Sequence, residues 1–117
     1  MASGGSAMAL ARSDGQAQIV AIHTLMIERF KDRRLKRLYE NGDRRRLPPQ
    51  HLEKIENILL ALEAADRIDD IDLPGFRLHP LKGDLKGFWS VTVRANWRIV
   101  FRFENGRAFE VELIDYH

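Results

Sequence analysis

The spacing of the hydrophobic residues along the chain changes at Phe76, and this change predicts where helices give way to strands. In residues 49–65 the apolar positions recur every three or four residues, as expected for one face of a helix. These positions are Leu52, Ile55, Ile58, Leu59 and Leu62. From Phe76 onward apolar and polar residues alternate, as expected for strands with one buried face. The pattern therefore predicts helices followed by strands, which is an α+β fold.

A shorter helix is predicted ahead of this one. Residues 31–41 place three apolar side chains on one side and basic side chains around the rest, and Gly42 follows as a stop signal. The three apolar residues are Leu35, Leu38 and Tyr39. Residues 26–30 alternate in a way that predicts a short strand before this helix, and residues 44–46 form a basic loop after it.

Four strands are predicted in the rest of the chain. They are Phe76–Leu81, Phe88–Arg94, Trp97–Phe103 and Ala108–Ile114. Turns are expected at residues 82–84 and 95–96, where Gly, Asp and Asn interrupt the alternation. The residues predicted to face the core are Trp89, Val91, Val93, Trp97, Ile99, Phe101, Phe103, Phe109, Val111 and Leu113. Arg94 and Arg98 then fall on the opposite face of two adjacent strands.

The last hairpin has two possible registers. A two-residue turn at 105–106 would place the core residue Phe101 opposite the charged Glu110. A three-residue loop at 104–106, with Gly106 left-handed, instead aligns the apolar residues. Its pairs would be Phe101–Phe109, Ile99–Val111, Trp97–Leu113 and, on the outer face, Arg98–Glu112. Exposing a core side chain costs roughly 1.5–3 kcal/mol, which is more than turn types differ, so we predict the three-residue loop.

Composition excludes several kinds of site. The chain has 117 residues, of which 44% are hydrophobic and 31% charged, as in one soluble domain with a modest core. It has no cysteine, so disulfides, thiolate metal sites and a cysteine nucleophile are excluded. The four histidines lie at positions 23, 51, 79 and 117, without metal-ligand spacing, so no metal site is expected. No apolar run approaches the roughly 18 residues of a membrane span.

The first 25 residues differ from the rest of the chain. Residues 1–18 are rich in Ala, Gly and Ser and have no periodic pattern. No hydrophobic segment follows Arg12 directly, so a secretory signal is not expected. We expect residues 1–25 to be a disordered leader or an extension from an upstream start site, and residues 26–117 to form the compact domain.

The charges are unevenly distributed along the chain. Residues 26–46 hold nine Lys or Arg against four Asp or Glu, a balance of +5. Residues 47–76 hold two against seven, a balance of −5, and residues 77–117 hold seven against five, a balance of +2. Two basic stretches on either side of an acidic one suit a polyanion on one surface and a basic partner on another. The alternative is that these blocks are only solvated helix faces.

Residues 115–117 (Asp-Tyr-His) follow directly on the last predicted strand. A sheet that carries them to a fixed place would gather an acid, a phenol and an imidazole, which can exchange protons near neutral pH. Lys82, Arg94 and Arg98 would lie around the same sheet surface, with His79 nearby. Cleavage of RNA without a metal needs a base for the 2′-OH, cations for the phosphorane charge and an acid for the departing 5′-oxygen. These residues include candidates for all three.

Each of these residues also has a simpler interpretation. The last three residues can be a solvated tail, and Arg98 can merely pair with Glu112 across the strands. His79 comes before Pro80 and can be structural, while Lys82 can belong to an ordinary turn. The residue types alone therefore indicate phosphate binding and no more.

The segment HPLKGDLKGFWSVTVRANWRIVF (residues 79–101), together with the terminal Asp-Tyr-His, resembles the HigB-type toxins of the RelE/ParE superfamily of type II toxin–antitoxin systems. The similarity covers residues 26–117. It implies a small antiparallel-dominated sheet packed on two amino-terminal helices. The active-site residues that it implies are Lys82, Arg94, Arg98, Asp115, Tyr116, His117 and, more remotely, His79.

The resemblance also implies an activity and partners. HigB-type toxins resemble ribosome-dependent endoribonucleases that cut mRNA in the decoding site and arrest translation, without a metal or another cofactor. The implied partners are the ribosome, mRNA and a helix-turn-helix antitoxin of the HigA type in a hetero-oligomeric complex, in the cytoplasm and not at a membrane. The basic residues expected to contact RNA or the ribosome are Arg29, Lys31, Arg33, Arg34, Lys36, Arg37, Arg44, Arg45 and Arg46.

Two other functions stay open from the sequence. Some members of the same superfamily poison DNA gyrase and cut no RNA, although they generally lack the basic and acid–base set found here. Alternatively, the chain could be a non-catalytic module that binds RNA or the ribosome through its basic helix and its arginine face.

Overall fold

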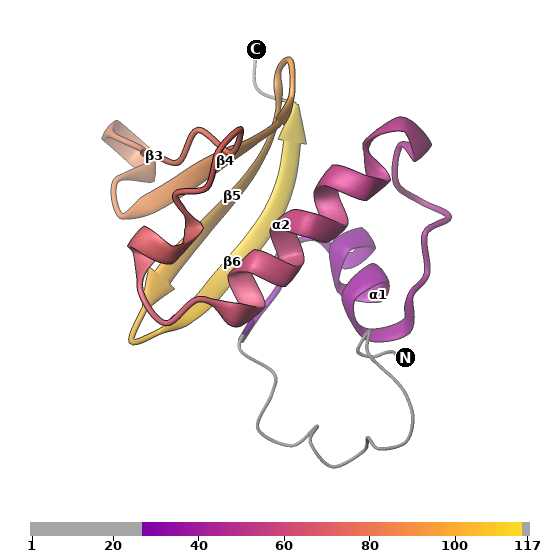
Figure 1. Ribbon diagram of the computed structural model, residues 1–117, viewed down its shortest axis with the longest axis horizontal. Helices are drawn as coiled ribbons and strands as arrows, with labels where there is room; N and C mark the ends of the chain where they lie inside the picture. Colours follow the sequence, from indigo (N-terminus) through magenta and orange to yellow (C-terminus); the bar gives the residue numbers. More distant parts are fainter. Residues whose placement is uncertain (1–26, 116–117) are drawn as a thin grey trace.

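The computed structural model describes residues 27–115. The expected leader at 1–25 lies outside the described residues, as do Met26, Tyr116 and His117. Within residues 27–115, two helices pack against one face of a four-stranded antiparallel sheet (Figure 1). This arrangement confirms the predicted α+β fold. In this part of the chain no helix is both long enough and apolar enough to cross a membrane.

Helix α1 spans Arg33–Asn41 and starts two residues later than predicted. It starts there because the side chain of Asp32 accepts a hydrogen bond from the backbone N–H of Arg34 and so caps the helix. The helix ends at Gly42 as predicted, where a left-handed backbone (φ 71°) suits a residue without a Cβ. The predicted apolar residues Leu35, Leu38 and Tyr39 are all buried.

Helix α2 spans Leu52–Ala64 and follows a short 3-10 turn at Pro49–His51. Proline suits this entry because the first N–H groups of a helix have no partner within the helix. The five predicted core residues of this helix are buried, which confirms its orientation. They are Leu52, Ile55, Ile58, Leu59 and Leu62.

The sheet has four antiparallel strands that are neighbours in sequence order. They are β3 (His79–Pro80), β4 (Phe88–Arg94), β5 (Trp97–Glu104) and β6 (Arg107–Asp115). Helix α2 packs on β4 and β6, and α1 packs on β6 (Figure 1). The sheet residues buried in this core are Val91, Val93, Ile99, Phe101, Ala108, Val111 and Leu113. Both helices therefore contact β6, the strand that leads to the candidate residues at the chain end.

The first predicted strand of the sheet is much shorter than expected. The prediction of Phe76–Leu81 was wrong, because only His79–Pro80 pairs with β4. Arg77 has a left-handed backbone (φ 52°), so the chain bends at this point instead of extending. The carbonyl of Phe76 still accepts a hydrogen bond from the N–H of Thr92 (2.7 Å).

The predicted short strand at 26–30 is not continuous either. Its described part makes two isolated parallel bridges to β6, from Ile27 to Ala108 and from Phe30 to Val111. The segment therefore lies along the outer edge of β6 without becoming a regular strand.

The hairpin between β5 and β6 has a different turn from the predicted one. The three-residue loop at 104–106 was wrong, because a two-residue turn, Asn105-Gly106, joins the strands and Glu104 pairs with Arg107. Both turn residues have positive φ (52° and 76°), as a type I′ turn requires. Asparagine followed by glycine is the sequence that this turn favours.

A β-bulge, not the turn, brings the apolar residues of β6 to the core. The register shifts so that Glu110 and Val111 together lie opposite Phe101, and Glu110 takes a left-handed backbone (φ 53°). Beyond the bulge, Ile99 pairs with Leu113, and both are buried. Holding Glu110 left-handed costs about 1–2 kcal/mol, whereas exposing a residue such as Leu113 costs roughly 1.5–3 kcal/mol for each side chain. The bulge is therefore the cheaper arrangement.

The two-residue turn and the bulge together change every predicted pair between β5 and β6. The observed pairs near the chain end are Trp97–Asp115, Arg98–Ile114, Ile99–Leu113 and Val100–Glu112. The predicted pairs Phe101–Phe109, Ile99–Val111, Trp97–Leu113 and Arg98–Glu112 were wrong. Phe109 was also wrongly assigned to the core: it is half-buried, and the guanidinium of Arg29 lies 5.7 Å from its ring centroid. Ala108 takes its place in the core.

Candidate active site

The ends of three strands meet at one edge of the sheet, and two of the predicted site residues lie there. Trp97, at the start of β5, pairs with Arg94 at the end of β4 and with Asp115 at the end of β6. We call these three residues the strand-end row. Neighbouring strands are about 4.8 Å apart, so the backbones of Arg94 and Asp115 are roughly 10 Å apart. Both of these residues are exposed, so a cation and a carboxylate flank Trp97.

Arg98 lies in the next row of the sheet, where it pairs with Thr92 and Ile114. Its Nη1 donates a hydrogen bond to the carbonyl of Ala95 (2.6 Å). Because Ala95 forms the turn next to Arg94, this bond holds the Arg98 guanidinium toward the strand-end row. Two guanidinium groups at neighbouring strand ends suit the oxygens of a phosphate.

His79 and Lys82 lie farther along the sheet. His79 is exposed and pairs with Ser90, in the middle of β4. Lys82 is also exposed and follows Leu81, whose N–H donates to the carbonyl of Phe88 at the start of β4. The backbone thus places Lys82 at the opposite end of β4 from the strand-end row.

The remaining predicted catalytic residues, Tyr116 and His117, lie outside the described residues and directly follow Asp115. Within residues 27–115, no three His, Asp or Glu side chains are grouped so that they could hold a metal ion. The described part of the candidate site therefore consists of the two arginines, Trp97 and Asp115.

The start of α2 supports the strand-end row from the helical side. His51 is buried, and its ring centroid is 6.0 Å from that of Trp97. Trp97 itself is half-buried and packs against the core, in agreement with the prediction. No pattern in the sequence connects His51 with Trp97, because the contact joins two elements that are far apart in the chain.

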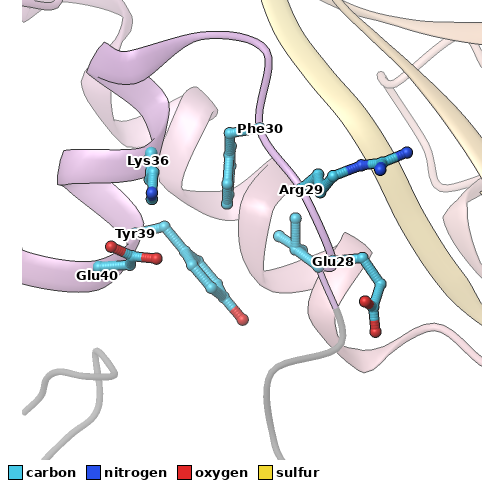
Figure 2. Close-up of a pocket in the computed structure, with 7 residues that line it drawn as sticks. Glu28, Arg29, Phe30, Lys36, Tyr39 and Glu40 are labelled. Carbon is cyan, nitrogen blue, oxygen red and sulfur yellow. The ribbon is translucent and has the colours of Figure 1, made fainter.

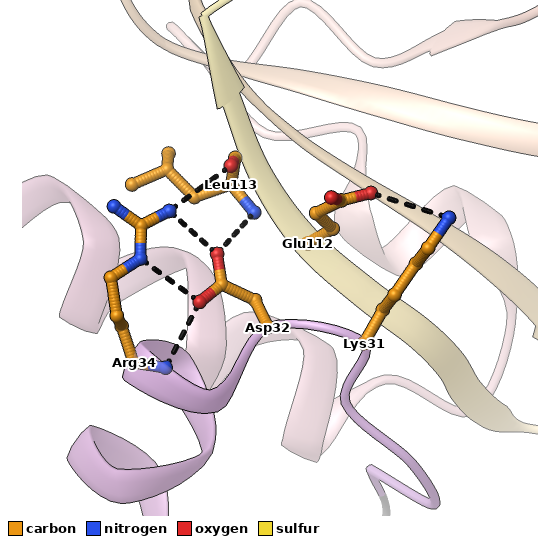
Figure 3. Close-up of polar contacts among 5 residues, drawn as sticks. All are labelled: Lys31, Asp32, Arg34, Glu112 and Leu113. Atoms are coloured by element: carbon orange, nitrogen blue, oxygen red, sulfur yellow. Dashed lines mark hydrogen bonds and ion pairs between the residues drawn. The ribbon is translucent and has the colours of Figure 1, made fainter.

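A buried carboxylate ties the start of α1 to β6, two residues before Asp115 (Figure 3). Asp32 is only 8% exposed, and its Oδ2 accepts a hydrogen bond from the N–H of Leu113 (3.1 Å). Arg34 donates to both carboxylate oxygens, from Nε to Oδ1 (3.0 Å) and from Nη2 to Oδ2 (2.8 Å). Its Nη2 also donates to the carbonyl of Leu113 (3.4 Å). We call Asp32, Arg34 and the backbone of Leu113 the Asp32 fork.

The electrostatics of the Asp32 fork favour the ionised carboxylate. Burial alone would raise the pKa of Asp32, but hydrogen bonds from Arg34 and from the amide of Leu113 outweigh burial and lower that pKa. The hydrogen bond to Asp32 in turn raises the pKa of Arg34. Removing one partner of such a buried pair typically costs about 3–5 kcal/mol. Arg34 was predicted to contact RNA, but its guanidinium is engaged in this fork.

The basic residues predicted to contact RNA fall into two groups in the structure. Five of them form ion pairs within the described chain: Arg29–Glu110, Lys31–Glu112, Arg34–Asp32, Arg44–Glu56 and Arg45–Asp43. The other four, which form no ion pair among residues 27–115, are Arg33, Lys36, Arg37 and Arg46. Three of these four lie on α1, away from its buried stripe, so this helix presents a basic face.

A pocket of about 590 Å³ lies apart from the strand-end row, between α1 and the segment that precedes it (Figure 2). Its described lining is Ile27, Glu28, Arg29, Phe30, Lys36, Tyr39 and Glu40. The rings of Phe30 and Tyr39 are 5.4 Å apart between centroids. Burial, together with the nearby charges of Glu63 and Glu40, raises the pKa of the Tyr39 phenol. No residue of the predicted catalytic set is among this lining.

Comparison with known proteins points to one family. Residues 28–117 match the HigB-like toxin family, described as the RelE-like toxin of the type II toxin–antitoxin system HigB. The chain is similar to the endoribonuclease HigB of Proteus vulgaris, with 46% identity over 92 residues that cover 79% of this chain and 100% of the relative. It is also similar to the toxin HigB-1 of Vibrio cholerae, with 36% identity over 86 residues that cover 72% of this chain and 90% of the relative.

The Asp32 fork should make stability depend on pH. Because the pKa of Asp32 in the folded state lies below its ordinary value of 3.8, the ionised carboxylate stabilises the fold above pH 3.8. This contribution is lost as the pH falls through the folded-state pKa. We expect Asp32→Asn to lower the free energy of unfolding in urea by about 2–4 kcal/mol at pH 7.

The difference between Asp32→Asn and the wild type should shrink as the pH falls below 3.8. Comparing the two proteins at each pH cancels the titration of the other carboxylates. A difference that stays constant throughout the acid range would show that the charge of Asp32 does not stabilise the fold.

Proposed function

Because the chain belongs to the family of HigB-like toxins, the RelE-like toxins of type II toxin–antitoxin systems, we propose that it is an endoribonuclease that cuts mRNA and arrests translation. A toxin of a type II system has an antitoxin as its partner. The observation that carries the proposal is the strand-end row: the sheet sets Arg94 and Asp115 on either side of Trp97, in a chain of this family.

We assign phosphate binding to Arg94 and Arg98. A guanidinium stays charged at any physiological pH and can donate two parallel hydrogen bonds to phosphate oxygens. These bonds would stabilise the extra negative charge that forms when the 2′-oxygen attacks phosphorus. The hydrogen bond from Arg98 to the carbonyl of Ala95 supports this role, because it holds that guanidinium beside the turn that follows Arg94.

We assign acid–base catalysis to Asp115, Tyr116 and His117. One group removes the proton from the 2′-OH, whose oxygen forms a bond to phosphorus, and another donates a proton to the 5′-oxygen as its bond to phosphorus breaks. The products are a 2′,3′-cyclic phosphate and a free 5′-OH. The imidazole titrates near neutral pH without help, and closely placed groups share their protons as a set. We also include Lys82 and His79, as groups that would contact the RNA farther along the sheet from the strand-end row, where the backbone places them.

We further propose that cleavage takes place in the decoding site of the ribosome. The described site offers few groups beyond the two arginines to orient a long RNA, so an mRNA that is already held in place would supply the missing orientation. Action on ribosomes would place the toxin in the cytoplasm. We also propose that its antitoxin is a helix-turn-helix protein of the HigA type, in a hetero-oligomeric complex with the toxin.

The basic face of α1 suits contact with ribosomal RNA. Arg33, Lys36 and Arg37 form no ion pair among residues 27–115, and Arg33 and Lys36 are exposed. Contact of these side chains with RNA phosphates would release counterions, which makes binding sensitive to salt. The ion-paired residues of the basic set should contribute less, because their charges are already partly balanced.

Replacing the terminal histidine should separate cleavage from binding. We expect expression of the wild type to arrest growth and to create new mRNA 5′ ends inside translated codons. His117→Ala should abolish the arrest and these ends while the protein still sediments with ribosomes, because the imidazole moves protons and does not hold the ribosome. Arg94→Ala should slow cleavage about 10²–10³-fold, as expected for the loss of one group that stabilises the transition state.

The alternatives predict different outcomes of the same experiment. A fully toxic His117→Ala protein would show that acid–base chemistry at the chain end is not needed. Loss of toxicity in Arg94→Ala alone would favour a binding module. Growth arrest with DNA breaks and intact mRNA would favour a gyrase poison.

The basic face of α1 can be tested by its salt dependence. The double variant Arg33→Ala/Lys36→Ala should weaken ribosome binding and reduce the slope of log affinity against log salt by about two, since each phosphate contact contributes about one. The matched control is Arg29→Ala/Arg45→Ala, which removes two exposed charges that are ion-paired in the structure. An equal reduction of the slope in both double variants would contradict a specific role for α1.

A further inference from the structure

Strand β6 is an edge strand of the described sheet. Backbone groups of another segment pair with its outer edge only along the first part of the strand. The segment before α1 bridges to Ala108 and to Val111, and the N–H of Lys31 donates to the carbonyl of Val111 (3.0 Å). The chain then enters α1 at Asp32 and turns away from the strand. The backbone N–H and C=O groups on this edge beyond Val111 therefore need other hydrogen-bond partners.

Leu113 is the next residue whose backbone groups face this edge, and two side chains supply its hydrogen bonds (Figure 3). The carboxylate of Asp32 accepts from its N–H, and the guanidinium of Arg34 donates to its carbonyl. In an antiparallel sheet a neighbouring strand would supply one acceptor and one donor at this position. The Asp32 fork supplies the same two groups from side chains.

The fork acts close to the candidate catalytic residues. Leu113 precedes Asp115 by two residues, about 7 Å along a strand. On its other edge, β6 is held by the pairs Arg98–Ile114 and Trp97–Asp115. The end of β6 is therefore held on both edges, by β5 on one edge and by the fork on the other.

A second Asp-x-Arg pair, Asp43 and Arg45, forms the same side-chain fork without docking on a strand. Asp43 accepts hydrogen bonds from the backbone N–H and the Nε of Arg45 (3.1 and 3.0 Å), and from its Nη2 (3.1 Å). This is the same arrangement as between Asp32 and Arg34, but it is exposed, and the hydrogen bonds that its carboxylate accepts come from Arg45. An Asp-x-Arg fork thus forms by itself, and docking on Leu113 is an additional property of the first one.

We propose that Asp32, acting through Arg34 and the backbone of Leu113, is a positioning residue for the acid–base groups at the chain end. The inference rests on the proposed function, which assigns those groups to Asp115 and the two residues after it. Asp32 does not touch the RNA. It holds the end of β6 against β5 and so sets the position of Asp115, from which the chain continues to the two terminal residues.

Steady-state cleavage of mRNA on ribosomes by the full chain tests this role, with circular dichroism to establish the folded fraction of each variant. Asp32→Ala should lower kcat per folded molecule about tenfold to a hundredfold, because small displacements of catalytic groups have effects of this size. KM should change by no more than about twofold, since binding groups are untouched. Asp32→Asn should recover part of kcat, because its amide oxygen can still accept from the Leu113 N–H. Asp43→Ala, which makes the same change of charge in the second fork, should keep the wild-type kcat.

A wild-type kcat per folded molecule in Asp32→Ala would overturn the inference, and so would an Asp32→Asn protein no more active than Asp32→Ala. If Asp32→Ala does not fold, the kcat of Asp32→Asn is compared with that of the wild type. A lower kcat per folded molecule supports the inference, and an equal kcat overturns it. The His117→Ala variant distinguishes failure of the proposed function from failure of the positioning role alone. If His117→Ala cleaves at the wild-type rate, the proposed function fails and the positioning role with it. If only Asp32→Ala cleaves at that rate, the positioning role alone fails.

Discussion

The pairing of β5 with β6 determines which residues meet at the end of the sheet, and it depends on two backbone features with positive φ. The Asn105-Gly106 turn starts the ladder, and the bulge at Glu110 shifts it by one residue. Without the shift, Leu113 would turn to the other face of the sheet, and Asp115 would no longer lie opposite Trp97. The left-handed cost at Glu110 is smaller than the cost of exposing both Val111 and Leu113, the two core residues of β6 that follow it.

The rest of the molecule holds this ladder in place. Helices α1 and α2 pack on β6, and the segment before α1 covers the first part of its outer edge. The Asp32 fork then covers Leu113, and His51 packs against Trp97 from the start of α2. Arrangement of the site is thus a property of the whole fold, although the groups assigned to chemistry lie at strand ends and at the end of the chain.

The helices and the fold class could be predicted from the sequence, because the spacing of residues such as Ile55, Leu59 and Leu62 is a local property that only a helix can bury. The need for Val111 and Leu113 to share the core face was predictable for the same reason. The bulge was not, because a loop and a bulge both restore the face and only the contacts of β6 with its neighbours distinguish them.

The candidate site was predictable only in part, for a similar reason. The arginines and the terminal triplet were visible as residue types and through a family resemblance. Asp32 and His51 were not, because their partners Leu113 and Trp97 lie far away in the sequence. Long-range contacts of this kind leave no spacing pattern in the sequence.

Disulfide trapping in this cysteine-free chain tests the central claim, the register of β6, most directly. Cysteines that replace Val100 and Glu112 should cross-link on mild oxidation, because residues opposite each other in an antiparallel pair lie within disulfide reach. Cysteines at Val100 and Glu110 should not, since these positions face each other only in the register without the bulge and with a three-residue loop. Efficient cross-linking of the second pair and not the first would contradict the position assigned to Asp115 and the site built around it.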